Sequence, residues 1–227
     1  MNTFRRCHST VRALRKSCAP ISGLDKPYDV NVFGQVTVIQ AFLPLLRRAA
    51  GRIITIGSIG DRLTLPYGAP LTSLKWVLAS ITEALRLELR PWAIRVVLIE
   101  PASINTDAVG KVQAEAEQVL QGLDEVQQAR YGATYRKMID RAVARERNGS
   151  SLQVVADLIL RVLNTTTPKT RYLVGRDARR LALLARWMPD GLFDRLRLRL
   201  FGLPTEFGGA RAADTAFVPT SSEKGVR

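Results

Sequence analysis

The chain has few of the residues that build metal sites and disulfide frameworks. It contains two cysteines and one histidine, and Cys7, His8 and Cys18 all stand near the N-terminus. They form no C-x-x-C pair and are too few for a four-ligand zinc site. We therefore expect no metal, no disulfide framework and a reducing, cytoplasmic environment.

Long apolar runs are also scarce. We expect none to reach the roughly 18 residues that cross a bilayer. The hydrophobic share of 46% is nevertheless enough for a core, and 227 residues suit one α/β domain rather than a disordered chain.

Acidic residues are outnumbered. Lys and Arg total 34 against 20 Asp and Glu, which gives a net charge of +14. Such a balance attracts nucleic acid or an anionic membrane surface. No nucleic-acid-binding motif and no aromatic stacking pair accompany the basic residues, so we expect no nucleic-acid partner. Solvated arginine-rich faces and an anionic cofactor explain the charge more simply.

Residues 1–27 differ from the rest of the chain. Several basic residues precede Asp25, the first acid: Arg5, Arg6, Arg12, Arg15 and Lys16. An organelle-targeting segment has this composition. We favour a disordered segment, or unrelated sequence where part of a fold would be expected, because helical periodicity begins only after it.

Residues 51–75, GRIITIGSIGDRLTLPYGAPLTSLK, are the stretch around which the chain is organised. They predict a buried strand over 52–57, a bend at Ser58, a loop, and a helix from Thr72 to about Arg90 that contains Lys75. Ligands of open α/β sheets bind outside the carboxyl ends of the strands. A hydroxyl and an ammonium delivered there form a candidate reaction centre.

The flanking segments predict further helices and strands. An amphipathic helix opens near Asn31 and runs to about Arg48, and Pro44 is expected to kink or shorten it. Apolar runs predict parallel strands, and amphipathic or polar periodicity predicts helices: strands at 94–100 and 170–175, helices within 108–148 and at 151–163.

Residues 177–201 alternate arginine with large apolar residues. Three interpretations stay open for this basic amphipathic segment: a cap over a substrate pocket, contact with a membrane surface, and simple packing. Tyr131, Tyr135 and Met138 are candidate pocket residues in the preceding helices, although packing on the body of the domain is the simpler role.

The order of these residues resembles the short-chain dehydrogenase/reductase family. That family carries a serine after a buried strand, a tyrosine about 13 residues later, and a lysine four residues after the tyrosine. Ser58 and Lys75 match, whereas Leu71 stands where the tyrosine belongs. Asn31 matches the family's asparagine, and residues 101–106, PASINT, are similar to its P-G-x-I-x-T turn, with Ala102 in place of the glycine.

The resemblance implies an α/β fold with a partial Rossmann-like, doubly wound parallel sheet. Residues 28–176 would form the C-terminal half of such a domain, 177–207 a helical cap, and 208–227 a disordered tail. Gly23 is the only glycine before Gly34, so the Gly-rich turn that holds a pyrophosphate at a helix N-terminus is absent. We expect an N-terminally truncated domain with one open sheet edge and poor solubility as a free monomer.

The resemblance also implies an activity, namely NAD- or NADP-dependent oxidation or reduction of a hydroxyl or carbonyl on a lipophilic substrate. In the family the serine holds the substrate oxygen, the lysine binds the nicotinamide ribose, and the asparagine holds a water. Pro101, Ile104 and Thr106 correspond to the turn that holds the nicotinamide carboxamide. Leu71 has no proton to give, so we expect weak or absent catalysis, with Tyr67 as a remote substitute.

Two alternatives from other classes remain. The family pairs its subunits through helices that correspond to 31–48 and 72–90, so the chain could be a non-catalytic module that binds a full-length relative or its own copy. It could also be a peripheral membrane protein that acts through 177–201. Cofactor binding favours the enzyme interpretation over both.

Overall fold

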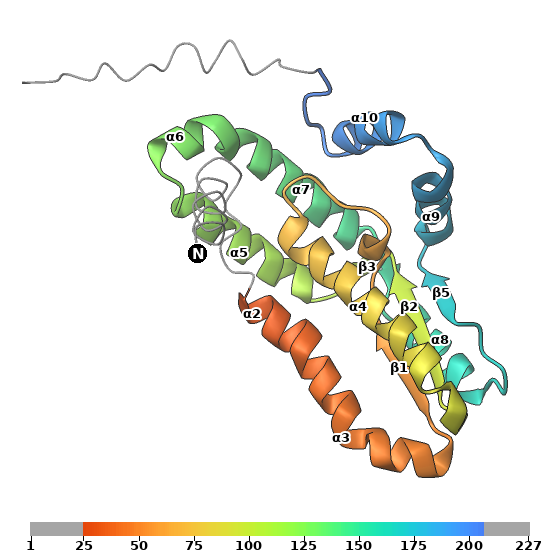
Figure 1. Ribbon diagram of the computed structural model, residues 1–227. Helices are drawn as coiled ribbons and strands as arrows, with labels where there is room; N and C mark the ends of the chain where they lie inside the picture. The colour runs from red at the N-terminus through yellow and green to blue at the C-terminus, as the bar shows by residue number, and fades with distance from the viewer. Residues whose placement is uncertain (1–24, 207–227) are drawn as a thin grey trace, which may run out of the picture.

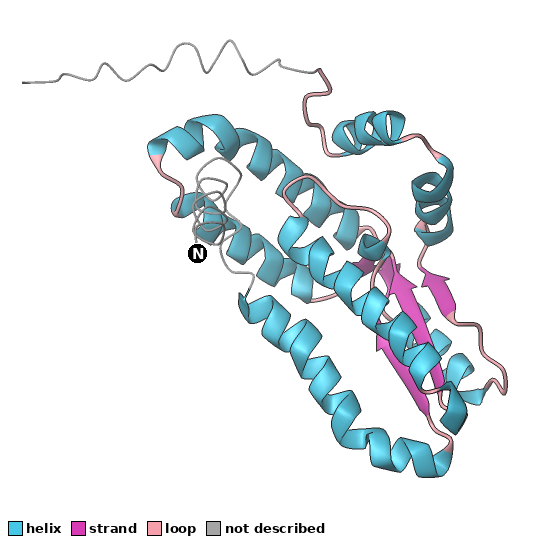
Figure 2. Ribbon diagram, in the orientation of Figure 1, coloured by secondary structure: helices cyan, strands magenta, loops and turns pink. Residues whose placement is uncertain are grey.

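The computed structural model describes residues 25–206, shown in Figures 1 and 2. The basic segment over residues 1–24 and the tail over 207–227 lie outside the described residues. Our predictions for those two segments therefore stay predictions.

A three-stranded parallel sheet lies at the centre of the fold, in the order β1-β2-β5. Arg52 pairs with Arg95 at the start of the first ladder, and Leu98 pairs with Arg171 at the start of the second. The α/β fold with a parallel sheet is confirmed. Its strands are β1 (Arg52–Ile56), β2 (Arg95–Pro101) and β5 (Arg171–Val174).

Two helices cover opposite faces of the sheet (Figure 2). α4 (Ala69–Glu88) buries Leu74 and Leu78, and α8 (Gln153–Asn164) packs on Val97 and Ile99 of β2. Successive β2 side chains point to opposite faces, so a strand covered on both sides needs apolar residues throughout. The run VVLI in β2 meets that need.

The N-terminal helix is continuous with a short π-helical turn. η1 (Asp29–Phe33) follows α2 (Asp25–Tyr28) and leads into α3 (Gly34–Ala49). Pro44 lies inside α3 and does not shorten it, although Figure 1 shows its last part turning toward β1. The helix ends at Ala49 and is followed by Ala50, whose backbone is left-handed with φ of 45°.

The same helix corrects one expectation about membranes. Asp29–Ala49 has 21 residues and is long and apolar enough to cross a membrane, by length and composition alone. The prediction that no segment reaches this length is therefore wrong. Asparagine and glutamine interrupt the apolar run in the sequence. Because these residues are uncharged, the mean hydropathy of the segment stays high enough for a membrane span.

The segment between β2 and α8 is helical, as its polar periodicity predicts. α5 packs against α7, and the short strands β3 and β4 pair in parallel beside them. The elements are β3 (Ile104–Asn105), α5 (Ala108–Gln121), α6 (Glu125–Gln127), η4 (Gln128–Gly132), α7 (Ala133–Arg147) and β4 (Ser150–Ser151). A short 3-10 turn, η3 (Arg90–Trp92), connects α4 to β2.

The basic amphipathic segment forms two helices separated at Pro189. α9 (Ala178–Trp187) and α10 (Asp190–Leu200) follow β5. Ala182 and Phe193 pack with Ile59 and Leu63 in one buried cluster. The inner sides of the two helices thus cover the loop that follows β1.

Candidate functional site

The candidate site lies at the carboxyl ends of β1 and β2. Ser58 leaves β1 in an extended conformation and caps η2 (Ile59–Asp61), where its Oγ accepts a hydrogen bond of 3.1 Å from the Gly60 N–H. The hydroxyl hydrogen stays available for another acceptor. The short helix packs against α4, where Thr72 lies beside Gly60.

Leu71 and Lys75 lie one turn apart on α4, so they share a face of the helix. The Leu71 side chain is 58% exposed. Burial lowers the pKa of the half-buried Lys75 ammonium, and the nearby Asp61 carboxylate opposes that shift. Among the described residues Lys75 has no ion-pair partner, which leaves its charge available to a ligand.

Asn31 lies in η1, which contacts α4. Its side-chain amide donates a hydrogen bond of 3.0 Å to the Pro27 carbonyl. The structure therefore brings the segment that carries Asn31 next to the helix that carries Lys75. In this arrangement the amide satisfies a backbone group of its own helix.

The turn over residues 101–106 is held by three backbone contacts. The Ala102 N–H donates to Val174, the Ser103 carbonyl accepts from Ser150, and the Ile104 N–H donates to Glu146 Oε2 at 3.2 Å. Ala102 is not among the described residues with left-handed backbone. Replacing the family's glycine with alanine thus introduces no strain here.

Tyr67 points toward α7 rather than standing free in the loop. Its hydroxyl lies 2.7 Å from the Thr134 Oγ1, and its ring meets Tyr135 edge-on at 5.6 Å. Both tyrosines border a buried cluster around Met138. These contacts hold Tyr67 in packing, and a catalytic role would require it to leave Thr134.

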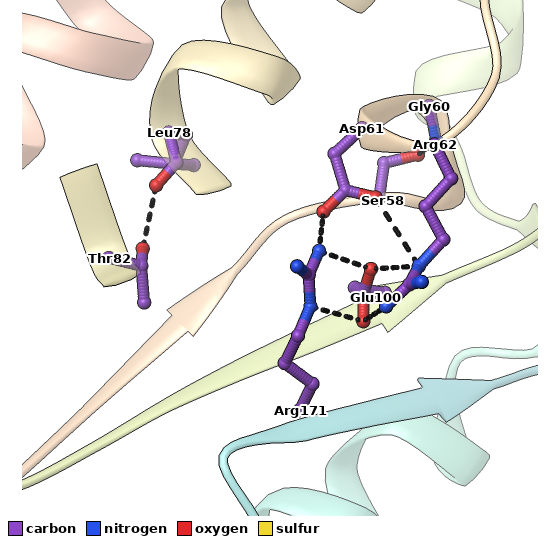
Figure 3. Close-up of polar contacts among 8 residues, drawn as sticks. All are labelled: Ser58, Gly60, Asp61, Arg62, Leu78, Thr82, Glu100 and Arg171. Carbon is purple, nitrogen blue, oxygen red and sulfur yellow. Dashed lines mark hydrogen bonds and ion pairs between the residues drawn. The ribbon is translucent and has the colours of Figure 1, made fainter. Parts of the chain in front are cut away.

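The sequence reasoning missed a buried charge network at the same edge (Figure 3). Glu100 is fully buried near the end of β2, and both its oxygens accept from Arg62 and Arg171. Arg171 also donates to Asp61 at 2.6 Å. The one signal of this network in the sequence is Glu100, the acid that ends the apolar run VVLIE. A carboxylate buried at the end of such a strand needs hydrogen-bond or ion-pair partners.

Asp61 is the least satisfied member of this network. Its side chain is fully buried, and its Oδ1 accepts no hydrogen bond within the described residues. Burial, reinforced by Glu100, raises the pKa of Asp61 to about 7, against the opposing pull of Arg171 and Arg62. The hydrogen bonds from the two arginines outweigh burial at Glu100 and lower its pKa.

The raised pKa of Asp61 predicts a pH-dependent stability. Between about pH 4 and pH 7 the folded chain binds a proton that the unfolded chain has released, so the free energy of unfolding falls as pH rises through this window. We expect a loss of roughly 2 kcal/mol between about pH 5 and pH 7. The lowered pKa of Glu100 acts in the opposite direction, because it stabilises the fold above the ordinary glutamate pKa of 4.5 and loses that effect as pH falls below it, mostly outside the range from pH 5 to pH 7.

Urea unfolding of the native chain and of Asp61→Asn across this range measures the effect. The asparagine variant cannot titrate, so subtracting its curve removes the contributions of other groups. The free energy of unfolding of the native chain should fall relative to that of the variant as pH rises. Parallel curves would show that Asp61 titrates near its ordinary value.

Comparison with known proteins identifies the family. Residues 16–117 match the family model described as short chain dehydrogenase. Retinol dehydrogenase 16 of Rattus norvegicus is 30% identical over 174 residues, which cover 74% of this chain and 54% of that protein. The chain belongs to the short-chain dehydrogenase/reductase (SDR) family. Estradiol 17-beta-dehydrogenase 2 of Mus musculus is 30% identical over 184 residues, covering 77% of this SDR chain and 47% of that protein.

A solved structure confirms the fold of this SDR member. A short-chain dehydrogenase from Burkholderia cenocepacia, in complex with NADP, has a TM-score of 0.56 and 23% identity, and the match covers 77% of this chain and 60% of that one. The chain spans about half the length of the curated relatives it matches. The individual roles of Ser58, Lys75 and Leu71 stay predictions.

Proposed function

We propose that this chain carries the substrate-side half of an SDR oxidoreductase site, with its proton-transfer group replaced. The observation that carries the proposal is that Ser58 and the turn over 101–106 follow the carboxyl ends of the paired strands β1 and β2, and that η2, which Ser58 caps, contacts α4, which carries Lys75. Curated relatives named as retinol and estradiol dehydrogenases support a lipophilic alcohol or carbonyl as the substrate.

The donor set fits the nicotinamide end of an NAD or NADP cofactor. Within residues 25–206 the half-buried Lys75 ammonium has no ion-pair partner and the Thr106 hydroxyl makes no hydrogen bond. We propose that Lys75 binds the nicotinamide ribose and that Pro101, Ile104 and Thr106 hold the carboxamide. The cofactor would supply hydride transfer to or from the carbinol carbon.

The remaining residues would orient the substrate and move its proton. The Ser58 hydroxyl can donate to the substrate oxygen while its own oxygen accepts from Gly60. Asn31 would hold a water near Lys75. Oxidation of the alcohol must release the hydroxyl proton to a base as the carbon–hydrogen bond breaks, and Leu71 offers none. We therefore propose impaired catalysis, with cofactor binding weaker than in an SDR that carries a Gly-rich turn.

Turnover of the full chain with NAD or NADP tests this proposal on all-trans-retinol and estradiol as probes. We expect a low rate that falls further in Ser58→Ala, because the substrate oxygen then loses its donor. Tyr67→Phe should leave the rate unchanged, since the Tyr67 hydroxyl is engaged by Thr134. A rate abolished by Tyr67→Phe would instead identify Tyr67 as the substitute base.

A second candidate function is a non-catalytic interaction module, which the exposed side of α3 favours. No residue of α3 is buried. Val38, Phe42 and Leu45 are 58%, 55% and 52% exposed and lie along one stripe. A groove of about 280 Å³ separates this helix from α4. An apolar face of this kind supports pairing with a second copy or with a longer SDR subunit.

Sedimentation of the full chain tests the pairing. We expect an oligomer that Phe42→Glu converts to a monomer, because a buried carboxylate at the pairing face has no partner. Leu163→Glu on α8 is the matched control, since Leu163 is 51% exposed, close to the 55% of Phe42. A native chain that is already a monodisperse monomer would contradict the pairing.

A further inference from the structure

The outer side of α9 is both basic and apolar. Its exposed residues are Arg179, Arg180, Leu183, Arg186 and Trp187. The Trp187 side chain is 72% exposed and Leu183 is 59% exposed. The Arg186 guanidinium lies 5.2 Å from the centre of the Trp187 ring. Since the opposite side of α9 is packed on the loop after β1, this outer side is turned away from the core.

α10 continues the same character after Pro189. Leu192 and Leu200 are 56% and 41% exposed, and Arg195 and Arg199 are exposed with them. Phe193, by contrast, is buried against the core. The exposed residues of the two helices together are called the α9–α10 outer face.

The arginines of the α9–α10 outer face have no acidic partners within residues 25–206. The acids of this region that form ion pairs, Asp177 and Asp194, are taken by Arg145 and Arg197. The five arginines outnumber Asp190, the exposed acid of α10 that pairs with none of them within residues 25–206, so the face presents net positive charge beside large apolar side chains. That combination matches the boundary of a bilayer, where apolar side chains enter the acyl region and arginines meet the headgroups.

We propose that the α9–α10 outer face docks on an anionic phospholipid surface. A second copy of the chain does not suit this face, because pairing it with itself would oppose arginine to arginine. Nucleic acid would leave Leu183, Leu192 and Leu200 without a role. A lipid surface uses the arginines, the leucines and the tryptophan together.

The proposal does not depend on the proposed oxidoreductase activity, but it gives that activity a setting. The inner sides of α9 and α10 cover Ile59 and Leu63, directly after Ser58. Docking would thus bring a bilayer close to the reaction edge, where a lipophilic alcohol could arrive from the membrane. The helix α3 lies well away from α9 and α10 (Figure 1), so its apolar stripe is a different surface.

Sedimentation with vesicles tests the docking on the full chain. The vesicles are phosphatidylcholine alone or phosphatidylcholine with phosphatidylserine. The triple variant Arg179→Gln, Arg180→Gln, Arg186→Gln removes charge from the face. A control triple removes equal charge from exposed arginines elsewhere: Arg90→Gln, Arg95→Gln, Arg161→Gln. Circular dichroism checks that each variant stays folded.

We expect binding to the phosphatidylserine vesicles that weakens in high salt. Each arginine near an anionic surface adds about fivefold in affinity, so the face triple should weaken binding roughly a hundredfold and the control triple far less. The tryptophan emission should shift to the blue on binding, and Trp187→Phe should remove that shift.

Four results would overturn the proposal. These are absence of binding, equal binding to phosphatidylcholine alone, equal weakening by both triples, and a blue shift that survives Trp187→Phe. Equal weakening would mean that net charge, not this face, attracts the chain. Capture by polyuridylate without vesicle binding would assign the arginines to nucleic acid instead.

Discussion

Replacing Leu71 with tyrosine is expected to raise the rate of alcohol oxidation by about 10²–10⁴-fold, the usual contribution of general acid–base catalysis. The phenol would stand one helical turn before Lys75, whose ammonium favours the phenolate. Leu71 is 58% exposed, so the larger side chain displaces no core packing. Initial rates of NADH or NADPH formation from all-trans-retinol and estradiol measure the gain.

Two variants separate proton transfer from other effects of the substitution. Leu71→Phe adds the same ring without the hydroxyl, so it should give no comparable gain. Lys75→Met in the Leu71→Tyr background should remove most of the gain, because the phenol then loses its cationic neighbour. An equal rise in the Phe and Tyr variants would assign the effect to packing and contradict the role of residue 71.

Replacing Glu100 with glutamine is expected to lower the free energy of unfolding by about 3–5 kcal/mol, the usual cost of breaking a buried ion pair. The native carboxylate accepts from Arg62 at 2.6 and 3.0 Å and from Arg171 at 2.8 and 3.1 Å. The glutamine amide nitrogen would face these guanidinium donors and could accept from neither. For a chain of this length the midpoint of thermal unfolding should fall by roughly 10 °C.

Glu83→Gln is the matched control for this experiment. Glu83 pairs with Arg86 at 3.2 Å, but its side chain is 61% exposed, and such surface pairs contribute about 0–1 kcal/mol. Urea denaturation of both variants gives the comparison directly. A loss in Glu100→Gln no larger than that in Glu83→Gln would show that the network contributes little to stability.

The strands could be predicted closely because their signal is local. Continuous apolar runs predicted 52–57, 94–100 and 170–175, and the strands lie at Arg52–Ile56, Arg95–Pro101 and Arg171–Val174. The start of α4 was placed late, at Thr72 instead of Ala69. The structure includes Pro70 in the first turn of α4, where proline fits because its missing N–H is not needed.

The polar contacts of the site could not be predicted from local patterns. Arg171 is 110 residues from Asp61 and 71 from Glu100 in the chain, and only the parallel pairing of β2 with β5 brings them together. The contact of Glu146 with the Ile104 N–H depends in the same way on how α7 crosses the turn. Ser58, Lys75 and the turn over 101–106 were found through their order and spacing, which the family resemblance supplied.

Titration of the full chain with NADH and NADPH, followed by nicotinamide fluorescence, tests the central claim most directly. If Lys75 and the turn over 101–106 form the nicotinamide end of an SDR site, emission should change saturably in the native chain. Lys75→Met, which removes the ammonium, should abolish or strongly weaken that change. Absence of binding to both cofactors, or equal binding by Lys75→Met, would contradict the oxidoreductase account and favour the interaction module.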